Sequence, residues 1–279
     1  MIYHVGISGG KDSAATLLWL VKESGIEPSR IRASFCDTGN EALETYEYVQ
    51  MLSLKVHPIE TIKPPLDFYE LATKKGCFPS TKVRFCTEHL KREPTKNHIA
   101  YLQRSNYVML VTGVRADESP QRRKLREFDY DAVFRACVWR PILKWTFQNV
   151  TDILRKYDVP MNPLYKKGAR RVGCFPCINS NKAEIAMIAR DYPERIEFLK
   201  QKEESLGKTF FCPNKTPQKY NTHTWANPKT GKTHSVVSID GVARWALNGL
   251  EQTLIFEGFE ELDDRDDYAC SAHSAVMCE

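Results

Sequence analysis

The chain has 279 residues, of which 42% are hydrophobic and 27% are charged, and its formal net charge is +5. This composition is typical of a soluble globular protein, and the mild charge permits a tRNA or DNA partner without requiring one. No apolar run approaches the roughly 20 residues that span a bilayer, and nine cysteines in so long a chain argue against a secreted disulfide framework. We therefore expect a cytoplasmic protein with no secretory signal and no membrane contact.

The first half of the chain alternates between apolar strand-like runs and helical patterns. Strands are predicted at 2–7, 30–37, 55–59 and 107–113, and helices at 14–20, 41–54, 66–75 and 88–103, the last interrupted near Pro94. This alternation predicts an α/β fold with a doubly wound, mostly parallel sheet that is covered on both faces. Ligands bind beyond the carboxyl ends of such strands, where residues 8–13, 36–39 and 113–115 fall.

The pattern changes after Pro141. An amphipathic helix is predicted at 146–157, followed by a tight knuckle at 174–177, a long helix at 183–206, a hairpin turn at 227–231, a closing helix at 239–250 and an acidic tail at 257–267. We divide the chain into a nucleotide-binding domain at 1–145, a helical segment with a metal knuckle at 146–206 that packs on it, and a C-terminal extension at 207–279 without an assigned role.

The segment Ser8-Gly9-Gly10-Lys11-Asp12-Ser13 follows the first strand and opens a helix. Glycines let the backbone approach an anion, and the first N–H groups of a helix point toward it. Lys11 adds a positive charge, and Ser8 and Ser13 add hydroxyl donors. The spacing differs from a Walker-type loop. The segment therefore predicts a phosphate site, with an ordinary glycine turn as the alternative.

The hexapeptide resembles the pyrophosphate-binding loop (PP-loop) of the ATP pyrophosphatases, which cleave ATP between the α and β phosphates and adenylate a substrate. Other segments resemble motifs of the phosphoadenosine phosphosulfate (PAPS) reductase family, within the adenine nucleotide α-hydrolase-like superfamily. They are Asp37-Thr38-Gly39 through Glu44-Thr45-Tyr46, Gly113-Val114-Arg115 through Glu118-Ser119, Pro141 through Trp145-Thr146, and Asn162-Pro163-Leu164-Tyr165 followed by Gly173-Cys174-Phe175-Pro176-Cys177. The resemblance extends over roughly residues 1–200.

Within this family, the intact loop favours ATP over a sulfonucleotide. The PAPS reductases also carry a near-terminal Glu-Cys-Gly-Leu/Ile-His segment, which residues 269–273 match only loosely. The resemblance therefore implies an ATP pyrophosphatase coupled to sulfur transfer. The alternatives are a PAPS or adenylyl sulfate reductase, and a non-catalytic regulatory module that binds adenine nucleotides.

The resemblance also implies roles for individual residues. Lys11, Asp12 and Arg115 are the predicted catalytic residues; Asp12 would help to hold Mg²⁺, and Arg115 would brace the α phosphate. The predicted nucleotide-binding residues are Ser8, Gly9, Gly10, Lys11, Asp12, Ser13, Asp37, Thr38, Gly113, Arg115 and Arg123. Arg122 and Arg123 would extend the cationic wall beside Arg115. A cap or a surface ion pair is the alternative for Asp37 and Arg115, and a solvated face is the alternative for Arg122 and Arg123.

Four cysteines form two pairs, Cys77 with Cys86 and Cys174 with Cys177. Four thiolates suffice for a [4Fe–4S] cluster or a Zn²⁺ ion, and the family resemblance favours the cluster. Buried thiols or a redox-active pair are the non-metal alternatives. The predicted partners are an adenine nucleotide, a sulfur donor protein, and tRNA or DNA. The nucleic acid would contact basic segments at 74–92, 166–171 and 215–232, which solvated loops explain equally well.

Overall fold

The computed structural model describes residues 1–211, 216–226, 231 and 233–255. Its central element is a six-stranded sheet in the order β3-β2-β1-β4-β6-β5. The strands are β1 (Ile2–Ile7), β2 (Ile31–Cys36), β3 (Ile59–Ile62), β4 (Val108–Val111), β5 (Phe128–Asp131) and β6 (Ala136–Trp139). Every pair is parallel except β5 with β6, so the carboxyl ends of β1, β2 and β4 meet at one edge.

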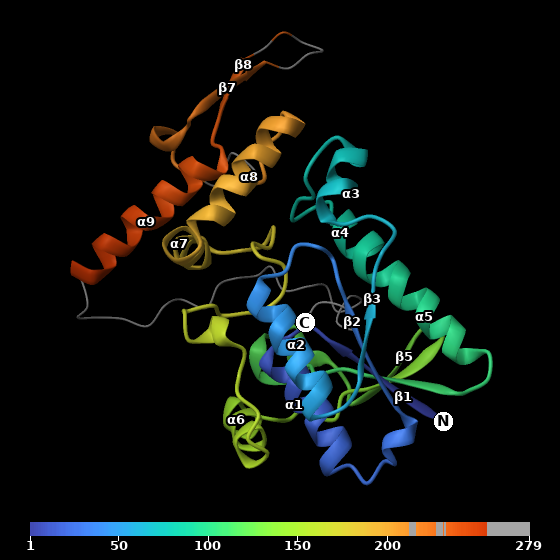
Figure 1. Cartoon of the computed structure of the whole chain (residues 1–279). Helices are drawn as coiled ribbons and strands as arrows, with labels where there is room; N and C mark the ends of the chain where they lie inside the picture. Colours follow the sequence, from blue (N-terminus) through green and yellow to red (C-terminus); the bar gives the residue numbers. More distant parts are fainter. Residues whose placement is uncertain (212–215, 227–230, 232, 256–279) are drawn as a thin grey trace.

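Helices cover both faces of the sheet (Figure 1). On one face, apolar side chains of α1 (Lys11–Lys22), α2 (Leu43–Lys55) and α6 (Phe147–Lys156) form the largest core cluster with β1 and β2. On the other face, Ile99 of α5 (Glu93–Gln103) packs on β1, β4 and β6. The burial of β1 on both faces explains its nearly continuous apolar sequence.

The remaining helices extend beyond the carboxyl edge of the sheet. They are α3 (Phe68–Lys75), α4 (Phe85–Thr87), a π-helical turn (Glu88–Arg92), α7 (Lys182–Asp191), α8 (Pro193–Leu206) and α9 (Ile239–Ile255). An antiparallel hairpin of β7 (His223–Ala226) and β8 (Thr233–Val236) precedes α9. Short 3-10 helices lie at Pro28–Arg30, Ala116–Glu118, Arg122–Lys124, Pro163–Tyr165 and Gln218–Tyr220. Among the described residues, every helix is too short or too polar to cross a membrane.

The predicted doubly wound, mostly parallel α/β fold is confirmed. Three details of the prediction were wrong. The third strand lies at Ile59–Ile62 because α2 continues through Lys55. The predicted helix 183–206 is two helices, since Pro193 lacks the N–H that a continuous helix requires and instead begins α8. The β5–β6 hairpin had no predicted counterpart.

Other predictions agree with the structure or lie outside its described part. The interruption near Pro94 is the π-helical turn, and the closing helix extends to Ile255. The predicted hairpin turn falls largely on residues 227–230, and the acidic tail and the 269–273 segment fall within 256–279. All of these lie outside the described residues. The division into three parts stays a prediction.

Candidate functional site

The PP-loop joins β1 to α1 at the carboxyl edge of the sheet. Gly9 has a φ of +78°, and a Cβ atom there would lie 2.6 Å from Cγ2 of Thr45. Gly10 caps α1 without a side-chain hydrogen bond, and its N–H donates to Oγ of Ser8 at 3.2 Å. Oγ of Ser13 donates to the Gly10 carbonyl at 3.0 Å. The loop therefore forms a tight turn before α1. Its cap residue, Gly10, has no side chain that could cover the first N–H groups of the helix, which suits an anion site.

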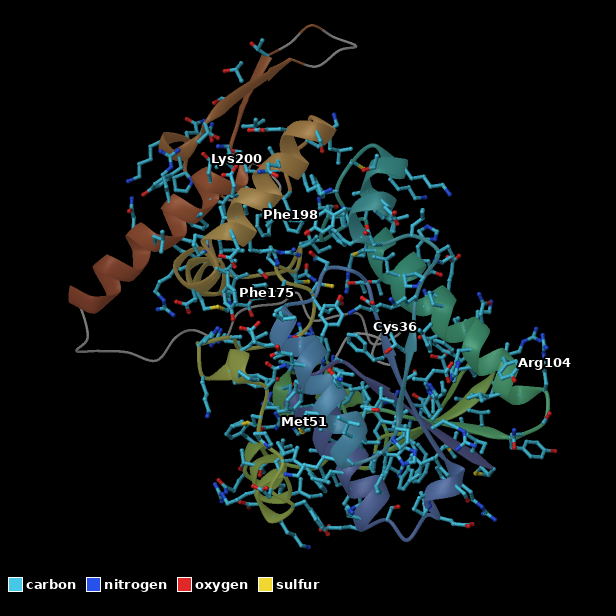
Figure 2. All side chains as sticks on the ribbon, viewed as in Figure 1. Cys36, Met51, Arg104, Phe175, Phe198 and Lys200 are labelled. Carbon is cyan, nitrogen blue, oxygen red and sulfur yellow. The ribbon has the colours of Figure 1, made fainter. Side chains whose placement is uncertain are left out.

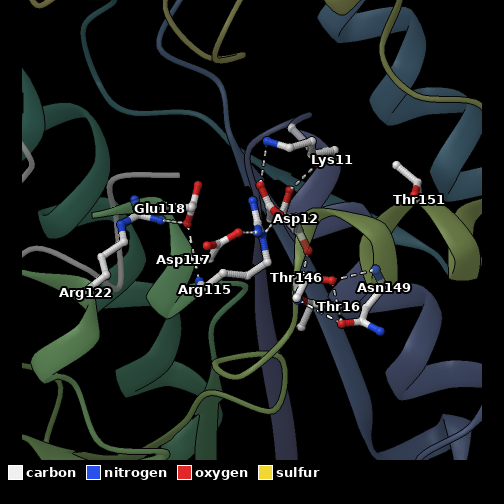
Figure 3. Close-up of polar contacts among 12 residues, drawn as sticks. Lys11, Asp12, Thr16, Arg115, Asp117, Glu118, Arg122, Thr146, Asn149 and Thr151 are labelled. Atoms are coloured by element: carbon white, nitrogen blue, oxygen red, sulfur yellow. Dashed lines mark hydrogen bonds and ion pairs between the residues drawn. The ribbon is translucent and has the colours of Figure 1, made fainter. Parts of the chain in front are cut away.

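Lys11, Asp12 and Arg115 meet beside this turn (Figure 3). Nε of Arg115 donates to Oδ1 of Asp12 at 2.6 Å, and Nζ of Lys11 lies 3.0 Å from Oδ2 of the same carboxylate. Arg115 is only 4% exposed. Burial lowers the pKa of its guanidinium, but Asp12, Glu118 and Asp117 together raise it more, so the net pKa lies above the usual value. The structure thus brings the three predicted catalytic residues together, with the Asp12 carboxylate neutralised by two cations.

A basic segment covers the same hollow from the opposite side. Tyr165 accepts the N–H of Lys11 at 3.1 Å, where an anion would otherwise meet the helix. Arg170 and Arg171, together with Arg122, line the hollow around Lys11. Of the two arginines predicted to extend the cationic wall, Arg122 lines the hollow, whereas Arg123 is exposed and outside the lining. Sequence analysis assigned the basic segment 166–171 to a nucleic acid contact. Its position directly after the Asn162–Tyr165 motif was the feature of the sequence that pointed to phosphate binding instead.

Asp37 and Thr38 follow the end of β2 and are held by partners in the next loop and by Tyr46 in the first turns of α2. Oδ1 of Asp37 accepts from the Gly39 N–H at 3.0 Å and from the Tyr46 hydroxyl at 2.7 Å. The buried Thr38 hydroxyl donates to Oε1 of Glu41 at 2.7 Å. These contacts close the turn after β2, but Asp37 is not the cap of α2, whose N-cap residue is Ala42. Gly113 is buried beyond β4, two residues before Arg115.

A second hollow adjoins the phosphate hollow through Ser8. Its walls come from β1, β2, β4 and α5 and include Ser34, Thr95 and Thr112. Oγ1 of Thr112 is buried without a hydrogen-bond partner among the described residues. The second hollow thus combines apolar walls with hydroxyl groups beside the PP-loop.

The third hollow is a chamber of about 120 Å³ that contains cysteine side chains. Cys86, Cys174 and Cys177 line it, while Cys77 is exposed outside the lining. Burial raises the pKa of the Cys174 thiol to about 12, although Lys91 opposes this shift. Within the described part of the chain, no three metal-ligating side chains are close enough to hold a metal ion. The chamber therefore gathers three of the four predicted ligands without the geometry of a closed metal site.

Lys91 lies between the second hollow and the cysteine chamber and lines both. Burial lowers the pKa of its ammonium, but Cys174, Glu41 and neighbouring thiols raise it, so the net pKa lies above the usual value. Sequence analysis placed Lys91 only within the basic segment 74–92, because only the fold brings the π-helical turn between these hollows.

The fold and the adjoining hollows define an α/β protein with a glycine-rich turn at the carboxyl edge of its parallel strands. Residues 3–180 match the phosphoadenosine phosphosulfate reductase domain, and the chain belongs to that family.

Its relatives include both uncharacterized proteins and reductases. An uncharacterized 37.8 kDa protein of Escherichia phage 186 is 29% identical, over 99% of this chain and 96% of the phage protein. Adenosine 5'-phosphosulfate reductase 2 of Bacillus subtilis is 28% identical, over 51% of this chain and 60% of the reductase. The crystal structure of PAPS reductase from Candida auris, a phosphate complex, matches with a TM-score of 0.51 at 19% identity, over 63% of this chain and 82% of that one. This structural similarity shows that the two proteins share the α/β fold.

Proposed function

We propose that this protein is an ATP pyrophosphatase that adenylates a substrate and supports sulfur transfer to it. The proposal depends on one observation: the N-terminus of α1, where the Tyr165 hydroxyl now holds the Lys11 N–H, faces a hollow whose lining includes Lys11, Arg122, Arg170 and Arg171 besides the carboxylates of Asp12 and Glu118. These four cationic side chains, close to the backbone N–H groups at the start of α1, are suited to binding a polyphosphate. The β and γ phosphates would occupy this hollow, and the adenosine would occupy the adjoining hollow beside Thr112.

Cleavage at the α phosphate needs stabilisation of the charge that develops there and on the leaving pyrophosphate. The Arg115 guanidinium, fixed by Asp12, would supply donors at the α phosphate without reorganising. Lys11 would stabilise the leaving group, and Mg²⁺ on the phosphates would share that charge. Because Lys11 also pairs with Asp12, the leaving phosphates would compete with this carboxylate for the Lys11 ammonium.

The cysteine chamber is the proposed sulfur-transfer site. Cys86, Cys174 and Cys177 would hold a [4Fe–4S] cluster or Zn²⁺ together with Cys77, after Cys77 moves toward the chamber. When bound, such a group would supply a thiolate-ligated metal at which sulfur is held. Purification without oxygen, followed by iron and zinc analysis and an absorption spectrum, tests this assignment. Cys174→Ser should lose the metal and Cys137→Ser, at an exposed thiol on β6, should retain it.

The decisive experiment compares pyrophosphate release from ATP by the wild type and by Lys11→Ala. We expect kcat/KM to fall about 100-fold, because a leaving-group contact is lost in the transition state. Lys22→Ala, at the exposed far end of α1, is the matched control and should retain wild-type activity. Wild-type rates in Lys11→Ala would refute the proposal.

The second candidate is a sulfonucleotide reductase, which the similarity to the Bacillus subtilis reductase favours. Sulfite formation from PAPS or adenylyl sulfate with thioredoxin, in the absence of pyrophosphate release from ATP, would establish it. Nucleotide binding without either product would identify a non-catalytic regulatory module.

A further inference from the structure

Arg195 of α8 reaches across to the cysteine knuckle. Its Nε donates to the carbonyl of Phe175 at 2.7 Å, and Nη2 donates to the Tyr69 hydroxyl at 3.0 Å and to Oδ1 of Asn40. Its guanidinium also lies over the rings of Tyr69 and Phe198, 5.7 Å and 5.1 Å from their centroids. Figure 2 places Phe175 where the C-terminal helices meet the sheet layer. One planar cation thus contacts three segments that are distant in sequence.

Asn40 is the buried centre of this junction. The side-chain Nδ2 of Asn40 donates to the Pro176 carbonyl at 3.1 Å, and its side-chain Oδ1 accepts from the Tyr69 hydroxyl at 2.6 Å. The backbone carbonyl of Asn40 accepts from the Phe175 N–H at 2.6 Å. Two of these contacts fall on the residues between Cys174 and Cys177. The knuckle is therefore fixed in register against the loop that follows β2.

The same loop carries Thr38 and Glu41 beside Cys174. Oγ1 of Thr38 lies 3.7 Å from Sγ of Cys174, and Glu41 pairs with Cys174 in an isolated β-bridge. A shift of the knuckle would therefore move the Cys174 thiol relative to the carboxyl edge of the sheet. Because a guanidinium presents its donors in a rigid fork, a lysine ammonium cannot reproduce these contacts.

We infer that Arg195 is a positioning residue that holds Cys174 and Cys177 against the nucleotide-binding edge of the sheet. The role rests on the proposed function, in which these thiols act beside the bound nucleotide. Arg195 itself lines none of the three hollows. Its substitution should therefore leave nucleotide affinity unchanged while altering the environment of the thiols.

The test is pulsed alkylation of the full chain with N-ethylmaleimide under anaerobic conditions, with each cysteine quantified by peptide mass spectrometry. In Arg195→Lys we expect Cys174 and Cys177 to react at least about 3-fold faster, because local opening of the knuckle becomes easier. Cys36 on β2 should keep its rate, which excludes general loosening of the fold. The Kd for ATP should stay at the wild-type value while the kcat of the ATP-dependent reaction falls.

Two further variants make the test specific. Lys202→Met is the matched control, because Lys202 lies over the same two rings, 5.6 Å and 5.2 Å from their centroids, and should leave the labelling unchanged. Tyr69→Phe removes a hydroxyl from the junction, and its effect on labelling should be less than additive with that of Arg195→Lys.

Unchanged labelling of Cys174 and Cys177 in Arg195→Lys, or equal acceleration at Cys36, would overturn the role. The labelling rates do not depend on catalysis. They therefore test the positioning role of Arg195 even if the protein releases no pyrophosphate from ATP. Conversely, Lys11→Ala should lose activity and keep wild-type labelling, which separates the two proposals.

Discussion

Gly9 shows how a single residue determines the shape of the phosphate turn. Its positive φ and its close approach to Thr45 both exclude a side chain, whereas Gly25 has a similar φ of +73° with open space around it. The two glycines therefore separate the cost of an unfavourable backbone conformation from the cost of a steric clash.

We predict that Gly9→Ala destabilises the fold by about 2 kcal/mol or more, because backbone strain adds to the clash with Thr45. Gly25→Ala should cost only about 1 kcal/mol, since it suffers the strain alone. Urea unfolding followed by tryptophan fluorescence measures both values. Equal losses in the two variants would contradict the steric argument.

His4 provides a second prediction at this scale. Burial, and to a smaller extent the neighbouring His98, lower its pKa from 6.5 to about 3. Its Nε2 lies 2.9 Å from Oγ of Ser34 inside the sheet. The folded state therefore favours the neutral ring, and the stability that depends on this neutral form is lost as the pH falls below the unfolded value of 6.5.

We expect the difference in unfolding free energy between the wild type and His4→Gln to change by about 2 kcal/mol between pH 7.5 and pH 5. The wild type should be the one that weakens in acid. Urea unfolding at both pH values checks this, and a pH-independent difference would show that His4 does not carry the effect.

At the scale of elements, helix ends depend on local chemistry. α6 begins with a capping box, in which Oγ1 of Thr146 accepts the Asn149 N–H at 3.3 Å and Oδ1 of Asn149 accepts the Thr146 N–H at 2.8 Å (Figure 3). Its buried residues Val150, Ile153 and Leu154 pack against α1. The cap thus fixes the start of α6, which packs against α1, the helix that follows the PP-loop.

We predict that Thr146→Ala lowers the free energy of unfolding by about 1 kcal/mol, while Thr146→Ser, which keeps the hydroxyl, has a smaller effect. Thermal or urea unfolding distinguishes the two. An alanine variant as stable as the serine variant would show that the side-chain cap contributes nothing.

For the whole molecule, Glu203 connects the C-terminal elements. Its carboxylate accepts the N–H of Phe210 at 2.6 Å and the N–H of Ile239 at 2.8 Å, which ties α8 to the start of α9. Burial raises its pKa from 4.5 to about 7, although these two N–H groups oppose the shift. The folded state therefore holds the proton more tightly than the unfolded chain, and the stability of the molecule falls as the pH rises from 4.5 to 7.

We predict that the stability difference between the wild type and Glu203→Gln changes by about 3 kcal/mol between pH 4.5 and pH 7, with the wild type weakening as the pH rises. Glu204→Gln, at the exposed neighbouring residue, should show no such dependence. A constant difference for Glu203→Gln across this range would refute the assignment. Because His4 has the opposite sign, the two effects partly cancel between pH 4.5 and pH 6.5.

Local patterns in the sequence determined the α/β layering, the glycine turn and the grouping of Lys11 with Arg115 at one edge of the sheet. These follow from hydrophobic periodicity and from the rule that parallel strands end at the same edge. Hydrophobic periodicity did not predict the β5–β6 hairpin. Its two strands are short and partly exposed, so their alternation of apolar and polar residues is weak.

Only the tertiary structure decided which distant residues meet. Arg195 lies 155 residues from Asn40, and Tyr165 lies 154 residues from Lys11, yet each pair forms a hydrogen bond. No periodicity records such contacts, because they depend on how α8 and the basic segment pack on the sheet. The sequence by itself therefore specified an α/β protein with a glycine turn at its carboxyl edge, whereas packing selected Arg122 over Arg123 and gathered Cys86, Cys174 and Cys177 around Lys91.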